Sequence, residues 1–205
     1  MEDRFIKAVD KAIEQVVLDF RGDPTGHWSE RDIHWKLFRY LKEQQIFQKN
    51  CITELIRAEF PTRATYGDQK PARGHYDLVV LDPASLANPA VCEMSPWAPW
   101  DEYLELVKVV IAVEVKVWWY RWKPIKRRIN WDIKKLTDSQ NAVKYPYFLN
   151  FVQLDFSRKQ MRDYYFELRE YLAEEAKQYP QLKILCVPSD PKIQPSSDNW
   201  ISAVK

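Results

Sequence analysis

The sequence predicts a single α/β domain in which a mixed central β-sheet is flanked by helices. Apolar residues recur at helical spacing in four segments, and five short segments are rich in β-branched and aromatic residues. The composition agrees, because 46% hydrophobic and 29% charged residues in a chain of 205 are typical of a globular domain with a sizeable core. We expect the elements in the order α-α-β-β-β-α-β-α-β.

Two helices are expected at the start of the chain. Apolar residues three and four positions apart predict the first helix over 3–20, and a break with glycine and proline follows at 21–27. Ser29 is expected to cap the second helix, with Asp32 as its capping-box partner. This second helix is expected to end near Phe47.

Three strands are expected next, at 53–60, 75–81 and 109–117, and the first should stop at Pro61. Residues 82–107 separate the second strand from the third and are expected to form an inserted loop, rich at first in proline, alanine and tryptophan. Loops of this length are uncommon in compact domains and are often functional.

The second half of the chain is expected to alternate between helices and strands. Asn130 and Ser157 are expected to cap the two helices. The expected elements are a helix over 130–143, a strand over 147–154, a helix over 157–178 and a strand over 182–187. We expect one domain over 1–187, followed by an irregular tail over 188–205 that is rich in proline, serine and aspartate.

The composition excludes several classes of protein. Glycine occurs only four times, so glycine-rich phosphate loops and dinucleotide fingerprints are absent. The net charge of +2 predicts no global attraction to nucleic acid. The three cysteines form no Cys-x-x-Cys pair, and neither a signal peptide nor an apolar run long enough to span a membrane is recognised. We therefore expect a cytoplasmic protein without membrane contact.

The strand over 109–117 carries the first candidate site. Its odd-numbered positions are all β-branched and apolar, so they are expected to share one face. Glu114 and Lys116 then share the opposite face, roughly 7 Å apart along the strand. Because buried charges cost free energy unless they are paired or used, this pair is a candidate site.

Two further carboxylates are expected near this pair. Asp77 lies in the second predicted strand, on the face opposite Leu78 and Val80. Glu30 precedes Ile33 by three residues and Leu37 by seven, which places it on the core-facing stripe of its helix.

This set of side chains is suited to one kind of chemistry. Carboxylate oxygens bind hard divalent cations such as Mg²⁺ or Mn²⁺, which activate water and neutralise a phosphodiester. Asp77 and Glu114 are the candidate metal ligands, and Glu30 is expected to complete the shell. Lys116 is suited to orient the water or to stabilise the developing negative charge.

These residues resemble the PD-(D/E)XK nuclease superfamily, which has the restriction-endonuclease-like fold. The resemblance covers residues 28–155 and rests on the α-β-β-β-α-β order, on the helix with Glu30, on Tyr76-Asp77 and on Glu114-Val115-Lys116. It implies that Asp77 and Glu114 bind the catalytic metal, that Lys116 assists the nucleophilic water, and that Glu30 joins the site. It also implies a homodimer as one option, because many proteins of this fold dimerise.

The chain departs from the pattern of that superfamily in two ways. Tyr76 stands where the name-giving proline would precede the aspartate. The stretch between Asp77 and Glu114 is longer than usual, which requires 82–107 to be an insertion between two paired strands.

A basic and aromatic segment follows the candidate strand. Basic groups neutralise phosphates and aromatic rings stack on unpaired bases, so this segment is expected to bind nucleic acid. The alternative is a solvated loop whose tryptophans pack on the domain or on another subunit. The candidate nucleic-acid-binding residues are Arg121, Lys123, Lys126, Arg127 and Arg128, interleaved with Trp118, Trp119, Tyr120 and Trp122.

Ordinary structural roles are expected for several other polar residues. Glu30 would be favoured at a helix start by the helix dipole whatever else it does. His34 is expected to be a partly buried packing residue, and Glu59 a solvated strand residue. Further along, an exposed charged face of the third helix is expected to hold Asp132, Lys134 and Lys135.

Three functions follow from these observations. The first is a Mg²⁺-dependent nuclease that hydrolyses phosphodiester bonds in DNA, with RNA as a second substrate class. The second is a catalytically inactive protein of the same fold that binds nucleic acid or serves as an assembly subunit. The third is a glycosidase that uses paired carboxylates, which the adjoining Lys116 and the basic segment disfavour.

Overall fold

The computed structural model describes residues 2–23, 26, 28–47, 55–66, 72–95, 97–118, 125–153, 159–190, 192–193 and 199–201. Within these residues the chain forms a mixed α/β fold with a six-stranded sheet flanked by helices, which confirms the prediction of a mixed sheet between helices. Among the described helices, none is both long enough and apolar enough to cross a membrane.

The six strands lie in the sheet in the order in which they occur in the chain. The first three are antiparallel neighbours, the third to fifth are parallel, and the sixth is antiparallel to the fifth. The strands are β1 (Ile56–Tyr66), β2 (Ala72–Leu81), β3 (Val109–Trp118), β4 (Tyr145–Val152), β5 (Lys183–Pro188) and β6 (Trp200–Ile201).

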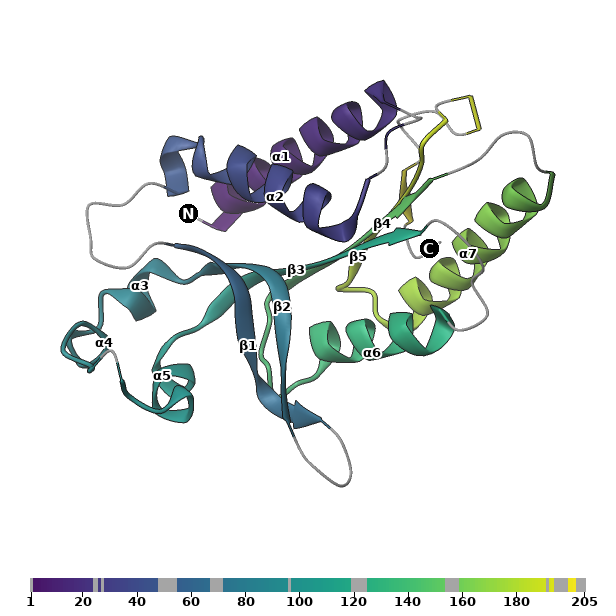
Figure 1. The fold of residues 1–205 in the computed structure, drawn as a ribbon. Helices are drawn as coiled ribbons and strands as arrows, with labels where there is room; N and C mark the ends of the chain where they lie inside the picture. Colours follow the sequence, from purple (N-terminus) through teal and green to yellow (C-terminus); the bar gives the residue numbers. More distant parts are fainter. Residues whose placement is uncertain are drawn as a thin grey trace.

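Two layers of helices cover the sheet (Figure 1). Helices α1 (Glu2–Gly22) and α2 (Glu30–Lys42) lie over one face, and α6 (Ile125–Thr137) and α7 (Lys159–Gln178) lie over the other. Parallel strands need a crossover connection, which α6 supplies between β3 and β4, and α7 between β4 and β5. Because helices cover both faces, β3 is buried along most of its length.

The sequence pattern explains the first helical layer. In α1 the buried residues recur every three or four positions, as in Phe5, Val9 and Ile13. In α2 the buried residues are Ile33, Leu37 and Leu41, one helical turn apart. Both stripes pack into one continuous core with the apolar residues of β2, β3 and β4.

Strand β1 runs further than the sequence predicts. The expected end at Pro61 is wrong, because the strand continues to Tyr66. Proline is tolerated in edge strands and bulges, where the missing N–H is not needed by a ladder. β1 is the first strand of the sheet, and its register with β2 shifts between Pro61 and Thr65.

The segment 82–107 is helical, whereas the sequence predicts a loop. It contains α3 (Pro83–Leu86), α4 (Pro89–Cys92) and α5 (Trp100–Leu106). Asp82 and Asn88 cap the first two with side-chain hydrogen bonds, and a proline follows each cap at the first helical position.

The base of this segment is closed by the sheet. Leu81 pairs with Val109, and the backbone N–H of Asp82 donates to the carbonyl oxygen of Lys108 at 2.9 Å. The Ser85 hydroxyl accepts a further hydrogen bond from the N–H of Lys108 at 3.1 Å. The two ends of the insertion are therefore held side by side.

Further boundaries differ from the prediction. Helix α6 covers Ile125–Thr137 instead of 130–143, so Asn130 lies inside it and accepts a hydrogen bond from the Tyr171 hydroxyl instead of capping the helix. Helix α2 ends at Lys42 and a short 3-10 turn follows. The tail is not wholly irregular, because Trp200–Ile201 pairs with β5. Ser157, the expected cap of α7, lies outside the described residues.

Replacing Ser29 with alanine should lower the free energy of unfolding by about 1 kcal/mol. Ser29 caps α2, since its hydroxyl accepts from the N–H of Asp32 while the Asp32 carboxylate accepts from the N–H of Ser29. Urea unfolding of the variant measures the loss. Ser139→Ala, in an exposed turn, is the control and should change the value by less than about 0.5 kcal/mol.

Candidate functional site

Strand β2 leaves β3 halfway along β3. The last pair of the ladder is Leu78 with Val113, whereas β3 continues beside β4 to Trp118. At this point the N–H of Val115 donates to Oδ2 of Asp77 at 2.7 Å. A side chain therefore replaces the strand partner, which satisfies the backbone and fixes one carboxylate at the free edge of β3.

Glu114 is held by a lysine of helix α6. Only 1% of Glu114 is exposed, and the Nζ atom of Lys135 donates to its Oε1 atom at 2.7 Å. The same ammonium donates to the carbonyl oxygen of His75 at 2.8 Å. Gly74 makes room for this lysine, because a Cβ atom there would lie 2.9 Å from the Cδ atom of Lys135.

Lys116 joins the two helical layers. Its Nζ atom lies 3.3 Å from Oδ2 of Asp132 in α6 and 3.8 Å from Oε2 of Glu30 at the start of α2. It also lies 3.9 Å from Oε2 of Glu114. Asp132 in turn lies 3.0 Å from Lys135, so the charged side chains form one connected cluster.

The four residues predicted as a site are thus brought together. Asp77, Glu114 and Lys116 lie at the free edge of β3, and Glu30 reaches Lys116 from α2. The predicted core-facing position of Glu30 is wrong, because 49% of its side chain is exposed. The structure adds Asp132 and Lys135, for which the sequence predicts an exposed face. That prediction is wrong, because each of these residues is only 6% exposed. Lys134 is exposed as predicted.

Negative charge exceeds positive charge in this cluster, which holds four carboxylates and two ammonium groups. Burial raises the pKa of Glu114, and the negative charge of Asp77 raises it further, against the lowering effect of Lys135. Burial also raises the pKa of Glu30, which Lys116 only partly offsets. The positive charges in the cluster therefore do not fully compensate these carboxylates.

The lysines respond in the opposite direction. Burial on its own lowers the pKa of Lys116, but the carboxylates around it, Asp132 first, outweigh burial and raise the pKa above its ordinary value. The pKa of Lys135 is raised in the same way. Burial lowers it, but the nearby carboxylates, Glu114 first, outweigh burial. Both side chains are therefore ammonium ions at neutral pH.

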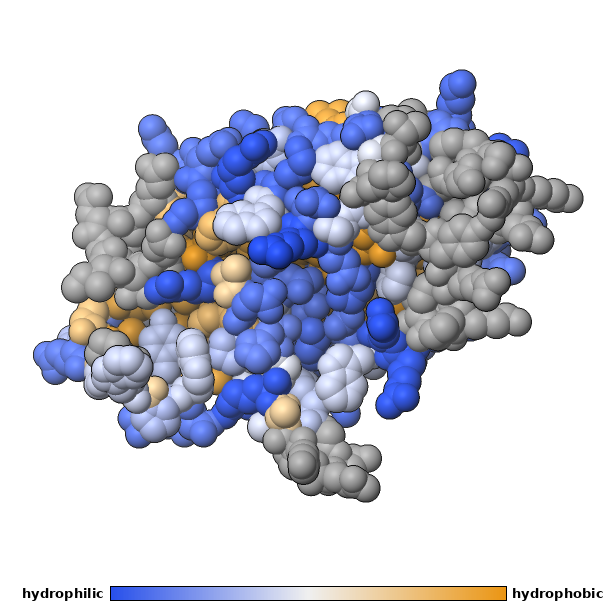
Figure 2. All heavy atoms as spheres, in the orientation of Figure 1, coloured by the Kyte–Doolittle hydropathy of each residue, from blue (hydrophilic) through white to orange (hydrophobic). Residues whose placement is uncertain are grey.

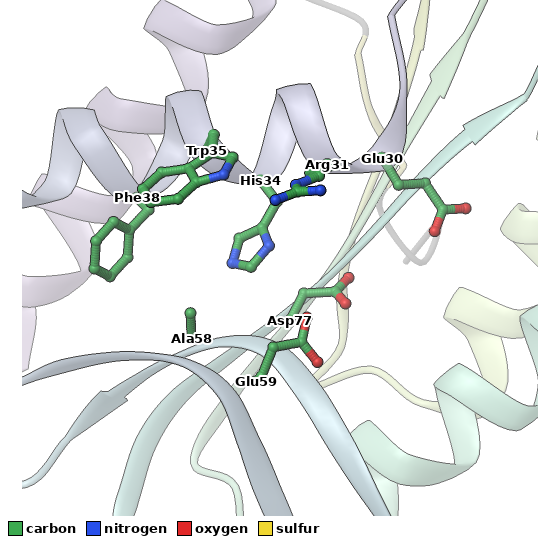
Figure 3. Close-up of a pocket in the computed structure, with 8 residues that line it drawn as sticks. All are labelled: Glu30, Arg31, His34, Trp35, Phe38, Ala58, Glu59 and Asp77. Carbon is green, nitrogen blue, oxygen red and sulfur yellow. The ribbon is translucent and has the colours of Figure 1, made fainter.

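A cavity of about 560 Å³ lies beside the cluster, between α2 and strands β1 and β2 (Figure 3). Figure 3 shows His34 directed from α2 into this space above Asp77 and Glu59. On the same face of the molecule, Figure 2 shows hydrophobic residues between the helices above and the strands below, within a surface that is mostly hydrophilic. The cavity is lined by Glu30, Arg31, His34, Trp35, Phe38, Ala58, Glu59 and Asp77.

Two of the cavity residues have unusual local features. Glu59 has a φ of 50°, in the left-handed region that residues other than glycine rarely adopt. His34 is partly buried as predicted, and its shielded Nε2 atom has no hydrogen-bond partner among the described residues. Glu59 is exposed, also as predicted. Backbone strain and unsatisfied polar atoms of this kind are frequent at functional sites.

The basic segment after β3 is described only in part. Arg121 and Lys123 lie outside the described residues, whereas Lys126, Arg127 and Arg128 are exposed in the first turn of α6. Trp118 is 5% exposed and donates its indole N–H to Asn150, so its ring packs within the domain, as the alternative interpretation of the segment expects.

The donor set suits a hard cation, because it consists of carboxylate oxygens without histidine or cysteine at the cluster. Within the described ranges, however, no three acidic, histidine or cysteine side chains are arranged to hold one metal ion. Mg²⁺ commonly keeps several water ligands and binds through one or two carboxylates. Asp77 and Glu114 would be enough for such a site.

Comparison of the chain with protein-family models, with curated proteins and with solved structures finds no match. The candidate site therefore rests on its own geometry and on the resemblance of its motifs.

Replacing Lys135 with methionine should lower the free energy of unfolding at pH 7 by about 3–5 kcal/mol, because Glu114 would stay buried without its nearest cation. Chemical unfolding of the variant measures the loss. Lys134→Met, at the exposed neighbouring position, is the matched control and should stay within about 0.5 kcal/mol of the wild type. Equal losses in the two variants would contradict the pairing.

The effect of Lys135→Met should also depend on pH. The pKa of Glu114 is raised in the folded protein, and loss of Lys135 raises it further. The stability that a protonated Glu114 contributes is complete below the ordinary carboxyl pKa and is lost as the pH rises through the raised one. The deficit of the variant should therefore shrink as the pH is lowered from 8 to 5.

Proposed function

We propose that this chain is a divalent-metal-dependent nuclease that hydrolyses phosphodiester bonds in DNA. The observation that carries the proposal is the position of Lys116, whose ammonium lies within 4 Å of the carboxylates of Glu30, Glu114 and Asp132 at the free edge of β3. A lysine among carboxylates beside a cavity is suited to metal-assisted phosphodiester hydrolysis, because a cation there can stabilise the developing negative charge.

The fold supports the proposal. The order α2-β1-β2-β3-α6-β4, with three antiparallel strands and a parallel crossover, agrees with the α-β-β-β-α-β order of the PD-(D/E)XK nucleases. Asp77 lies at the end of the β2–β3 ladder, and Glu114 and Lys116 lie on β3, which supports the roles that the resemblance implies for them.

The surplus of carboxylates supports the choice of cofactor. Asp77 and Glu114 would hold Mg²⁺ or Mn²⁺, and Glu30 would approach it through water. The metal would supply a bound hydroxide and neutralise the phosphate. Lys116 is charged at neutral pH and lies where it can orient the attacking water and stabilise charge on the phosphate oxygens.

Lys135 and Asp132 have a positioning role in this proposal. Lys135 fixes the rotamer of Glu114 through Oε1, and this contact leaves the Oε2 atom on the side of Lys116. Asp132 holds Lys116 and Lys135 together. Neither residue needs to touch the substrate.

One observation favours a second function, a catalytically inactive protein of the same fold that binds nucleic acid or assembles with other subunits. Glu114 is almost fully buried and already ion-paired with Lys135, as in a purely structural cluster. In this second case divalent cations would neither bind at Asp77 nor support cleavage.

Millimolar Mg²⁺ or Mn²⁺ should raise the melting temperature of the wild type. A metal at a hundredfold excess over its Kd adds about 2.7 kcal/mol, which is about 5–10 °C for a chain of this length. Asp77→Asn should abolish the rise, because asparagine still accepts the Val115 N–H but carries no charge. The rise should be larger at pH 8 than at pH 5, since the raised pKa values of Glu114 and Glu30 favour protonation at the lower pH.

If the metal shifts the melting temperature of neither the wild type nor Asp77→Asn, the second function is favoured. A shift of equal size in both proteins would place the cation elsewhere on the chain.

Lys116→Ala should lower the rate of DNA cleavage about 10²–10³-fold with little change in substrate affinity, because Lys116 acts on charge that develops in the transition state. Cleavage of labelled oligonucleotides in Mg²⁺, followed on gels under single-turnover conditions, measures the rate. Lys134→Ala is the control and should retain the wild-type rate. Undiminished cleavage by a folded Lys116→Ala protein would contradict the mechanism.

A further inference from the structure

One side of helix α2 carries a stripe of two aromatic side chains with basic side chains at both ends. Trp35, Phe38 and Lys42 follow Arg31 by four, seven and eleven residues. The four side chains therefore follow one another along the same side of the helix. Arg39 lies beside them. At about 1.5 Å per residue the stripe is about 16 Å long. We call these five residues the α2 stripe.

The aromatic members of the stripe are accessible. Trp35 is 59% exposed, and Phe38 is partly buried against the core. Their rings meet edge to face with centroids 5.9 Å apart. An exposed indole beside a second ring is suited to binding an apolar or aromatic ligand.

The basic members surround these rings. Arg31 and Arg39 are exposed, and the Nζ atom of Lys42 lies 5.6 Å from the centre of the Phe38 ring. Arg39 pairs with Glu43 at 3.7 Å, a distance and exposure at which an ion pair contributes little. A ligand with both negative charges and flat rings would match this stripe.

The stripe leads into the candidate site. A hollow of about 360 Å³ is lined by Trp35, Lys36, Phe38, Arg39 and Lys42. Trp35 and Phe38 also line the larger cavity, which Glu30 and Asp77 line as well. Figure 3 shows the two rings on α2 beside this cavity. The two hollows therefore lie next to each other along α2, and the larger one reaches two members of the charged cluster.

We infer that an unpaired strand of DNA lies along the α2 stripe and delivers its backbone to the charged cluster. The inference rests on the proposed function and specifies its substrate class. Bases would stack on Trp35 and Phe38, and phosphates would contact Arg31, Arg39 and Lys42. Stacking requires bases with free faces, which a duplex does not offer. A cavity of about 560 Å³ accepts a group of nucleotide size, in the range of small-ligand pockets, and excludes a double helix.

The test is binding of the full-length protein to fluorescein-labelled DNA in EDTA, followed by fluorescence anisotropy. A mixed-sequence single strand should bind at least about tenfold more tightly than the same sequence as a duplex. Trp35→Ala should weaken single-strand binding by about tenfold or more, and Trp35→Phe should restore part of it. Trp97→Ala is the matched control, because Trp97 is 92% exposed at a site away from the stripe, and should bind like the wild type.

The salt dependence gives a second readout. Each phosphate contact contributes to the slope of log affinity against log salt concentration. Arg31→Ala and Arg39→Ala should each make this slope shallower by about 0.7, the value for one phosphate of a single strand. Trp35→Ala should leave the slope nearly unchanged, because stacking releases no counterions.

Several results would overturn the inference. Tighter binding of the duplex, or tighter binding of a single-stranded RNA of the same sequence, would do so. Equal binding by Trp35→Ala and Trp97→Ala would also do so. A change of oligomeric state in Trp35→Ala would make the stripe an interface between copies of the chain. Because binding is measured without metal, its outcome is separate from cleavage. Single-strand binding through Trp35 without cleavage in Mg²⁺ would refute only the nuclease, and cleavage with duplex preference would refute only the stripe.

Discussion

The departure of β2 from β3 is the constraint on which the candidate site depends. A strand that loses its neighbour exposes backbone groups that must find other partners. Here Asp77 supplies that partner for Val115, and the space left by β2 is where Lys116 extends between the two helical layers. The end of the β2–β3 ladder therefore positions the Asp77 carboxylate, leaves one edge of β3 without a strand partner, and brings the cavity next to that edge.

The electrostatics of the cluster add a second constraint. Glu114 is buried with Lys135 of α6 as its nearest cation and Lys116 of β3 as a second one, so the packing of α6 on the sheet and the charge of this carboxylate depend on each other. Such a pair contributes little net stability compared with apolar packing, although breaking it is costly. The cluster thus holds two carboxylates, Glu30 and Glu114, whose pKa values burial raises.

Much of this could be predicted from the sequence, and the exceptions have physical reasons. Alternation along β3 separates Glu114 from its apolar neighbours. Helical spacing predicts an inward Glu30, but this residue lies in the first turn of α2, where its side chain is 49% exposed while its carboxylate approaches Lys116. The same spacing was available for Asp132, which lies three residues after Ile129 and four before Leu136, but the many basic residues around it favoured an exposed face. The direction of Lys135 could not be predicted, because it depends on the room left by a glycine distant in the sequence. The end of the β2–β3 ladder is likewise a tertiary property.

The closed base of the segment between β2 and β3 has a consequence for engineering. Because Asp82 and Lys108 are joined by a hydrogen bond at the end of a paired ladder, the two ends of the segment stay side by side. Its last helix also packs on β1, where Phe60 contacts the rings of Trp100 and Tyr103. Doubling the length of such a loop costs only about 0.6 kcal/mol of closure entropy. A reporter domain or a purification tag could thus be inserted after the exposed Glu93, between α4 and α5, while the sheet keeps its register.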